Sequence, residues 1–199
     1  MSKGYSHSHF ILHKPYGYLS QFINNQNRRK NKRLLGELYD FPKSTMAIGR
    51  LDETSEGLLF LTSDGEMSEY IRSRNVEKEY YVQVDGIITN EAIIKLQKGV
   101  EIGFNGQKYT TKPCKVHLVN SVSHLPLENR KVRDERHGPK SWASITVTEG
   151  KFRQVRKMTA AVGFPTLRLV RVRIGDIHLT IRTGEVIDVE AFLNNLQQK

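Results

Sequence analysis

Apolar residues fall along this chain in short runs, and most of these runs predict strands. Four or more apolar side chains in succession, or apolar side chains at every second position, are typical of strands. In residues 167–174, arginines alternate with apolar residues, which predicts one buried and one basic strand face. Pro113 is expected to interrupt the strand that contains it. The predicted strands are residues 9–13, 18–23, 57–62, 79–84, 109–119, 142–148, 167–174 and 186–189.

Five segments have the apolar spacing of short amphipathic helices. Asn90 is expected to cap the third helix and Gly99 to end it. Between the predicted elements, residues 120–141 read as a loop. Many strands with a few short helices indicate an α+β fold with a mixed, largely antiparallel sheet. The predicted helices are residues 33–39, a segment with Met67, Tyr70 and Ile71 on its apolar face, and residues 91–98, 154–162 and 191–196.

The composition excludes several classes of protein. The chain has 199 residues, of which 38% are hydrophobic, so it is too apolar for a disordered chain. No apolar run approaches the ~18 residues of a membrane helix, and the N-terminus lacks the apolar core of a secretory signal. A single cysteine, Cys114, excludes an intrachain disulfide and a multi-cysteine metal site. We therefore expect a cytoplasmic protein that does not enter membranes, with Cys114 as a small buried apolar residue.

The charge balance points to a polyanionic partner. The formal net charge is +10. Clustered cations bind phosphates well because binding releases condensed counterions. A solvated surface would explain any one cluster, but three together favour a nucleic acid. The clusters are Arg28, Arg29, Lys30, Lys32 and Arg33; Arg130, Lys131, Arg133, Arg136 and Lys140; and Lys151, Arg153, Arg156, Lys157, Arg168, Arg171 and Arg173, the last without an acidic residue between its ends.

Three short motifs could carry chemistry. In Gly49-Arg50-Leu51-Asp52, a carboxylate stands on a turn before a buried strand, where it could be a nucleophile or base. It could equally be a turn residue that binds its own backbone. The stretch 78–81 places tyrosines at a strand start, for base stacking or for cross-strand packing. Residues 149–158 place cations at a helix start, which favours phosphate or pairing with a carboxylate; a solvated helix face is the alternative.

These motifs, in this order, resemble the pseudouridine synthases. The resemblance lies in residues 49–65 (GRLDETSEGLLFLTSDG), 78–80 (KEY) and 149–175 (EGKFRQVRKMTAAVGFPTLRLVRVRIG). Lys14-Pro15-Tyr16-Gly17 also fits, and the likeness spans about residues 10 to 190. The subgroup is the one that modifies ribosomal RNA, with type A for the small subunit, and types B, E and F for the large subunit. It implies the catalytic fold of that family, with flanking helices and a central RNA-binding cleft.

Within this subgroup, the chain is most similar to type E. Most members carry a small RNA-binding domain ahead of the catalytic one, whereas only a few residues precede the first motif here. We therefore expect a single catalytic domain over residues 1–199. The loop residues 136–139 and the stretch 163–169 support the same branch. Two positions depart from the subgroup: Arg153 and Val170 stand where histidine is frequent.

The resemblance assigns roles to individual residues. Asp52 is the catalytic nucleophile or base, and Arg156 pairs with it. Tyr80, rather than Tyr81, stacks on the uracil. Arg50 fills the space left by the flipped base. The remaining substrate contacts are Leu169, which packs beside the base, and the cations Lys151, Arg153, Lys157, Arg171 and Arg173, which face phosphates.

The implied reaction is the isomerisation of a specific uridine to pseudouridine in large-subunit ribosomal RNA. The glycosidic bond breaks, the uracil turns over, and its carbon 5 bonds to the sugar, so neither a cofactor nor a metal is needed. The uridine must be flipped out of its helix, at a cost of a few kcal/mol. Asp52 could attack the sugar, add to the base or remove a sugar proton. We expect a monomer.

Two other functions remain open at this point. A non-catalytic RNA-binding or ribosome-assembly protein would explain the charge, but it would not need Asp52, Tyr80 and Arg156 together. A glycoside hydrolase could use two carboxylates to cleave a glycosidic bond. However, a hydrolase of neutral sugars has no use for the basic segment 151–173.

Overall fold

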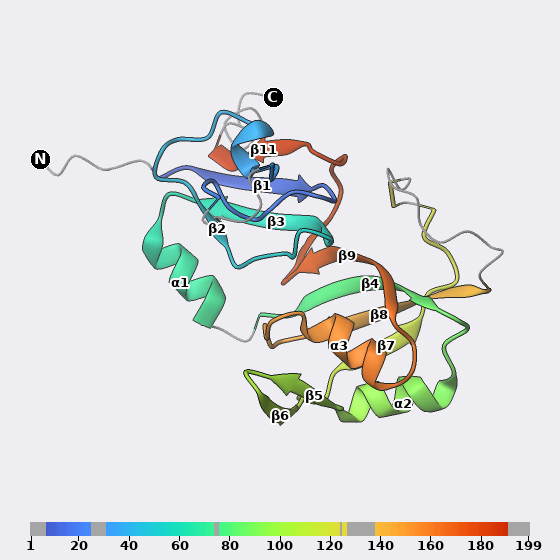
Figure 1. Ribbon diagram of the computed structural model, residues 1–199. Coiled ribbons are helices and arrows are strands. Elements are labelled where there is room, and N and C mark those ends of the chain that lie inside the picture. The colour runs from blue at the N-terminus through green and yellow to red at the C-terminus, as the bar shows by residue number, and fades with distance from the viewer. Residues whose placement is uncertain (1–6, 25–30, 74–75, 124, 127–137, 191–199) are drawn as a thin grey trace, which may run out of the picture. The chain divides into compact units, whose positions relative to one another are not determined.

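The computed structural model describes residues 7–24, 31–73, 76–123, 125–126 and 138–190 (Figure 1). The chain forms two compact units, and each is described by itself. Unit 1 comprises residues 1–74 and 179–199, and unit 2 comprises residues 75–178.

Unit 1 is built on an antiparallel sheet. Strand β1 (His9–Lys14) pairs with β11 (Val186–Asp188) on one side and with β3 (Glu56–Thr62) on the other, and β3 also pairs with β2 (Met46–Ile48). Helix α1 (Gly65–Ser73) follows β3, and a single 3-10 turn, η1 (Leu35–Glu37), precedes β2. The core of the unit contains Phe10, Leu12, Leu35, Leu59 and Leu61.

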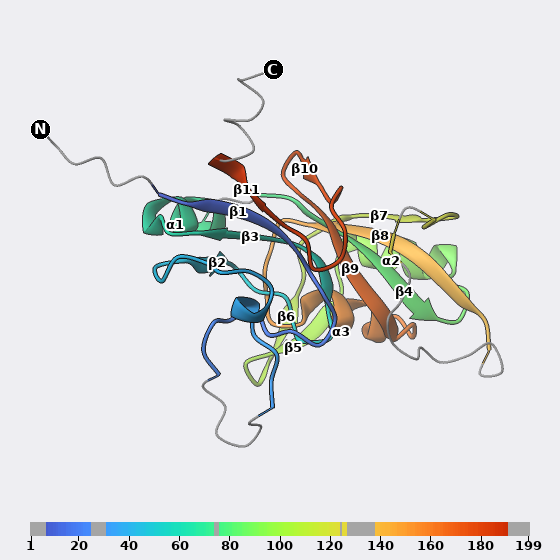
Figure 2. The same ribbon diagram turned by 90° about the horizontal axis from the view of Figure 1, so that it is seen from above.

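Unit 2 has β4 (Lys78–Asp85) at its centre, antiparallel to both β8 (Lys140–Val147) and β9 (Thr166–Ile174). Strand β7 (Lys115–Leu118) extends the sheet beyond β8, and β10 (Ile177–His178) pairs with β9. The hairpin of β5 (Glu101–Phe104) and β6 (Gln107–Thr110) is separate. Figure 2 gives a second view of these strands.

Helices α2 (Asn90–Lys98) and α3 (Gln154–Ala161) cover one face of the unit 2 sheet. Val82 and Val84 of β4 point to the same face because alternate strand residues share a face. They pack in one buried cluster with Leu96 of α2 and with Val155 and Met158 of α3. This common core holds the start of α3 at a defined place beside the sheet.

The predicted α+β class and most predicted strands are confirmed. Residues 18–23 were wrongly predicted as a strand; only Tyr18 forms an isolated bridge, to Arg33. The predicted helix 33–39 is only the short turn η1. Thr89, not Asn90, caps α2, because its hydroxyl accepts a hydrogen bond from the Ala92 N–H. The predicted helix 191–196 lies outside the described residues, as does most of the loop 120–141.

Two predicted surfaces also need correction. The apolar face of α1 is largely exposed, with Met67 39% and Tyr70 54% accessible. Conversely, β9 does not present a basic face to solvent, because Arg168 and Arg171 are only 5% and 3% exposed. Arg168 donates to the Pro126 carbonyl at 3.0 Å. The alternation of arginine and apolar residues in β9 therefore marks two covered faces rather than one buried and one wet face.

Candidate functional site

The turn that carries Asp52 connects β2 to β3 in unit 1. It begins at Gly49, whose φ of +72° favours glycine. Leu51 is buried and anchors the turn, whereas Arg50 is exposed and Asp52 is half-buried. The Asp52 carbonyl accepts a hydrogen bond from the Ser55 N–H at 3.0 Å, which closes the turn. The carboxylate of Asp52 thus stands on a short, tightly folded segment.

Ser20 holds the backbone on the N-terminal side of Asp52. Its buried hydroxyl donates to the Leu51 carbonyl at 2.9 Å and accepts from the Leu51 N–H at 3.0 Å. Both backbone polar groups of Leu51 are therefore satisfied by one side chain. Such paired bonds restrict the rotation of the peptide that leads into Asp52, so we call Ser20 a positioning residue.

Glu53 is held just as firmly on the C-terminal side of Asp52. Lys32 Nζ lies 2.5 Å from each carboxylate oxygen of Glu53. The Gly17 N–H donates to the Glu53 carbonyl at 2.8 Å, from a residue with φ of +83°. The motif Lys14-Pro15-Tyr16-Gly17, which contains Gly17, was part of the family resemblance. Nothing in the sequence pattern, however, predicted the role of Ser20 or the partner of Lys32.

Tyr80 lies on β4 in unit 2, half-buried and between two strands. It stands opposite Ile145 of β8 and Arg171 of β9. The pairing of β4 with β9 is irregular between Glu79 and Tyr80. Bulges of this kind re-aim side chains and are frequent beside active sites. The Tyr80 side chain itself packs against the core cluster of unit 2, and its stacking on uracil stays a prediction.

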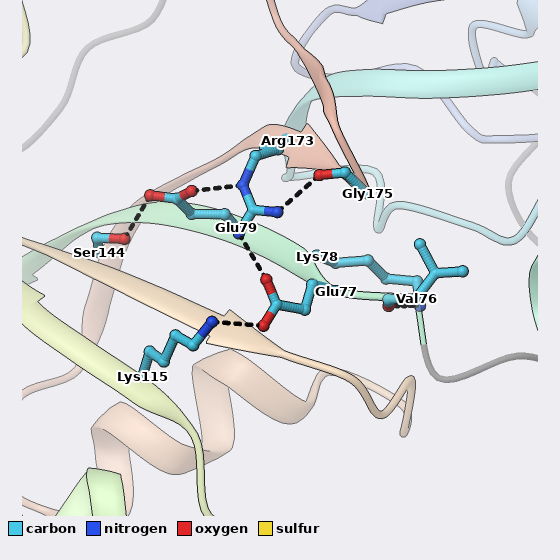
Figure 3. A network of polar contacts seen from close by, with 8 residues as sticks. All are labelled: Val76, Glu77, Lys78, Glu79, Lys115, Ser144, Arg173 and Gly175. Atoms are coloured by element: carbon cyan, nitrogen blue, oxygen red, sulfur yellow. Dashed lines mark hydrogen bonds and ion pairs between the residues drawn. The ribbon is translucent and has the colours of Figure 1, made fainter.

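A polar network fixes the strand immediately before Tyr80 (Figure 3). Glu79 accepts hydrogen bonds from Arg173 Nε at 2.9 Å and from the Ser144 hydroxyl at 2.8 Å. Glu77 accepts from Arg173 at 3.0 Å and from Lys115 Nζ at 2.7 Å. In these bonds the Arg173 guanidinium donates to groups of the protein itself. The phosphate contact expected of Arg173 stays a prediction.

The network makes the stability of the protein depend on pH. Burial raises the pKa of Glu79, but hydrogen bonds from Arg173 and Ser144 outweigh it and lower the pKa below 4.5. The pKa of Glu77 is lowered by its hydrogen bonds to Lys115 and Arg173. A carboxylate with a lowered folded-state pKa stabilises the fold above its unfolded-state pKa and loses that contribution as the pH falls through the folded value.

We therefore expect Glu79→Gln to lower the free energy of unfolding by about 1–2 kcal/mol at neutral pH, with the deficit shrinking below pH 4.5. Urea unfolding at several pH values measures this difference. Glu69→Gln is the matched control, because its ion pair with Arg72 is exposed and contributes less than about 1 kcal/mol. Equal, pH-independent losses for the two variants would rule out the role given to Glu79.

The start of α3 is organised around Glu149. Its carboxylate accepts hydrogen bonds from the Tyr109 hydroxyl, from the Lys112 N–H at 2.9 Å and from Gln154 Nε2 at 2.7 Å. Burial raises the pKa of Glu149, but these three bonds together lower it. Gln154 Oε1 also accepts from the Lys151 N–H at 3.0 Å. The first turn of the helix is thereby fixed to β6.

The other predicted site residues divide between the two units. Arg50 and Asp52 share the turn in unit 1, and all the others lie in unit 2. Leu169 is buried in the core opposite Val82. The cations at the start of α3 are half-buried or exposed: Lys151, Arg153, Arg156 and Lys157. The pairing of Arg156 with Asp52 stays a prediction.

The described residues contain no group of three His, Cys, Asp or Glu side chains that could hold a metal ion. Within that same part of the chain, no helix has the length and apolarity needed to cross a membrane.

His9 shares a hydrogen bond with the Thr62 hydroxyl at 2.9 Å. Cys114 is half-buried, and burial raises the pKa of its thiol to about 11. It is therefore a poor nucleophile at neutral pH, in line with a packing role.

Comparison with known proteins identifies the family. The family model of RNA pseudouridylate synthase matches residues 8–161. The chain belongs to the RNA pseudouridylate synthase family. The ribosomal large subunit pseudouridine synthase E of Xanthomonas axonopodis pv. citri (strain 306) is 42% identical over 92% of this chain and 94% of its own length. The enzyme of the same name from Vibrio parahaemolyticus is 41% identical over 85% of this chain and 68% of its own length.

The fold agrees with this membership. A crystal structure of a pseudouridylate synthase matches with a TM-score of 0.73 and 26% identity, covering 96% of this chain and 74% of that one. The resemblance in the three motifs is therefore confirmed, and so is the predicted fold class. As a pseudouridine synthase, the chain is an enzyme that isomerises uridine in RNA, and neither the non-catalytic nor the glycosidase alternative is favoured.

Proposed function

We propose that this pseudouridine synthase modifies a specific uridine in large-subunit ribosomal RNA. The observation that carries the proposal is the 42% identity, over 92% of the chain, to a synthase named for that substrate. The net charge of +10 suits a polyanionic substrate. We further propose that the enzyme acts in the cytoplasm as a monomer, which light scattering of the purified protein tests.

Mapping of modified uridines tests the substrate. Carbodiimide leaves a stable adduct on pseudouridine that stops reverse transcriptase. Purified enzyme incubated with unmodified large-subunit RNA should produce one new stop, and with small-subunit RNA none. New stops confined to small-subunit RNA, or to transfer RNA, would contradict the proposed substrate but not the reaction.

In this proposal, the residues of the three motifs have separate roles in the reaction. From the turn of unit 1 come Asp52, as nucleophile or base, and Arg50, which fills the place of the flipped base. From unit 2 come Tyr80, which stacks on the uracil, Leu169, which packs beside it, and Arg156, which pairs with Asp52.

Two cations lie near Tyr80 in the sheet. Arg171 stands opposite Tyr80 in β9, and Lys78 begins the same strand as Tyr80. Burial lowers the pKa of Lys78, and the charge of Arg171 lowers it further. Arg171 is only 3% exposed, and its contact with substrate stays a prediction.

The cations at the start of α3 are proposed to contact phosphates, and their removal should change the salt dependence of binding. Replacing Arg153 and Lys157 together with Gln should lower the magnitude of the slope of log affinity against log salt by about 1.4 for single-stranded RNA. Lys95 and Lys98, exposed on α2, give the control double variant. An unchanged slope for the first pair would remove these two residues from the interface.

The restraints around Asp52 should govern turnover rather than binding. Ser20→Ala removes both bonds to Leu51, and a small misplacement of a reacting group costs up to about 100-fold in rate. We expect kcat to fall at least about 10-fold while RNA affinity is kept, and Ser20→Thr, which retains the hydroxyl, to recover much of the loss. A parallel loss of RNA affinity would indicate a general defect instead.

A further inference from the structure

Phe152 stands in the turn just before α3 and is 66% exposed. Burial of a phenylalanine side chain is worth about 1.5–3 kcal/mol, so the ring remains in water at a substantial cost. Tyr39 and Tyr70 are less exposed, at 42% and 54%. An aromatic ring left this accessible is available to a partner.

A cation is fixed beside this ring. Lys157 Nζ lies 5.4 Å from the Phe152 ring centroid and donates a hydrogen bond to the Gly103 carbonyl at 2.7 Å. Lys151 Nζ lies 5.0 Å and 4.9 Å from the ring centroids of Phe104 and Tyr109, on the β5–β6 hairpin. The start of α3 and the hairpin thus combine aromatic rings with positive charges held in place.

The backbone next to Phe152 is strained. Arg153 has φ of +53°, in the left-handed region that non-glycine residues rarely adopt. Such strain persists only where neighbouring bonds enforce it, and it is concentrated at functional sites. Here the bonds of Gln154 to Glu149 and to the Lys151 backbone enforce it. The strained residue sets the direction of the turn that presents Phe152.

We propose that Phe152 is a stacking platform for an unpaired RNA base other than the uridine that is isomerised. Every base has an aromatic face that can stack on a ring, and each base carries a phosphate that the flanking cations can bind. Lys151, Arg153 and Lys157 supply those cations. The nearby carboxylate of Glu149 already accepts hydrogen bonds from three protein donors. The inference rests on the proposed function, since it takes RNA as the substrate.

Affinity for single-stranded RNA tests the platform. Loss of one stacked base typically weakens binding by about 10-fold, so we expect that loss for Phe152→Ala in the full chain with an oligonucleotide of about 12 nucleotides. Phe152→Trp should bind as tightly as the wild type. Tyr70→Ala, which removes an exposed aromatic ring from α1, should have no effect. Affinity of Phe152→Ala within about twofold of wild type would overturn the proposal.

Fluorescence separates stacking from simple charge attraction. The chain has one tryptophan, Trp142, so the double variant Trp142→Phe with Phe152→Trp reports on position 152 alone. Its emission should be quenched by single-stranded RNA and not by inorganic polyphosphate. Equal quenching by the two would contradict stacking.

Parallel assays of uridine isomerisation distinguish the two proposals. Normal isomerisation of large-subunit RNA together with unchanged binding by Phe152→Ala would refute the platform alone. Binding of RNA through Phe152 without any modification of that RNA would refute the proposed substrate and leave the platform standing.

Discussion

Replacing Asp52 with Asn should abolish pseudouridine formation while RNA affinity stays within about twofold of wild type. The substitution keeps the size of the side chain and removes its charge, its nucleophilicity and its basicity. Loss of a positioned base or nucleophile costs about 100- to 10,000-fold in rate. Asn also preserves the turn, which is closed by the backbone of Asp52 and Ser55 and not by the carboxylate alone.

Two comparisons make this test specific. Asp176→Asn, at an exposed aspartate between β9 and β10, should retain full activity. Asp52→Ala is expected to be inactive as well, but it also shortens the side chain in the turn, so Asn is the sharper variant. If Asp52→Asn turns over within about tenfold of wild type, Asp52 is neither the nucleophile nor the base.

The second large effect concerns Arg156. Arg156→Met removes the positive charge that is proposed to pair with Asp52, whereas Arg156→Lys keeps the charge and loses the forked geometry. We expect Met to lower kcat by about 100-fold or more and Lys to lower it less. Because the guanidinium is proposed to pair with the catalytic carboxylate, the loss should appear in kcat while RNA affinity is kept.

Measurement of kcat and of RNA affinity for wild type, Arg156→Lys and Arg156→Met tests whether Met loses more activity than Lys. Arg72→Met, on the exposed face of α1, is the control for loss of an arginine elsewhere. Near-normal turnover by Arg156→Met would refute the ion pair. A purely structural role for Arg156 would lower kcat equally for both variants, with no recovery by Lys.

The sequence was most informative about strands, because the local pattern of apolar and polar residues is enough to predict them. The apolar run in β3, the β-forming residues of β4 and the alternation of arginine and apolar residues in β9 predicted strands because these patterns are typical of strands. The segment 18–23 has the same apolar density, yet its backbone bonds to Arg33 and Leu35, in an isolated bridge and not in a regular ladder. Local pattern contains no information on these two partners.

The candidate site likewise contains residues that the sequence predicted and contacts that it did not predict. Asp52, Tyr80 and Arg156 were predicted because they lie in motifs that resemble those of a family. The bonds that hold these motifs join residues far apart in sequence: 31 positions for Ser20 and Leu51, 21 for Lys32 and Glu53, and 94 for Glu79 and Arg173. Such pairs have no local signature, so only the fold reveals them.

Charge along the sequence also overstated the basic surface. Lys32 is paired with Glu53, and Arg33 lies over the Tyr18 ring at 4.5 Å. Arg173 bridges two carboxylates. A run of cations in sequence does not show which members are held by protein groups. The cations around Phe152 have the surroundings that best suit the binding of RNA.

Release of tritium from RNA labelled at carbon 5 of uridine tests the catalytic role of Asp52 most directly. When carbon 5 bonds to the sugar, its hydrogen is lost to water, so each pseudouridine formed releases one label. Wild-type enzyme with large-subunit RNA should release tritium up to one equivalent per RNA, and Asp52→Asn should release none above background. Equal release by the two proteins, or no release by a wild-type enzyme that binds the RNA, would contradict the function proposed for this chain.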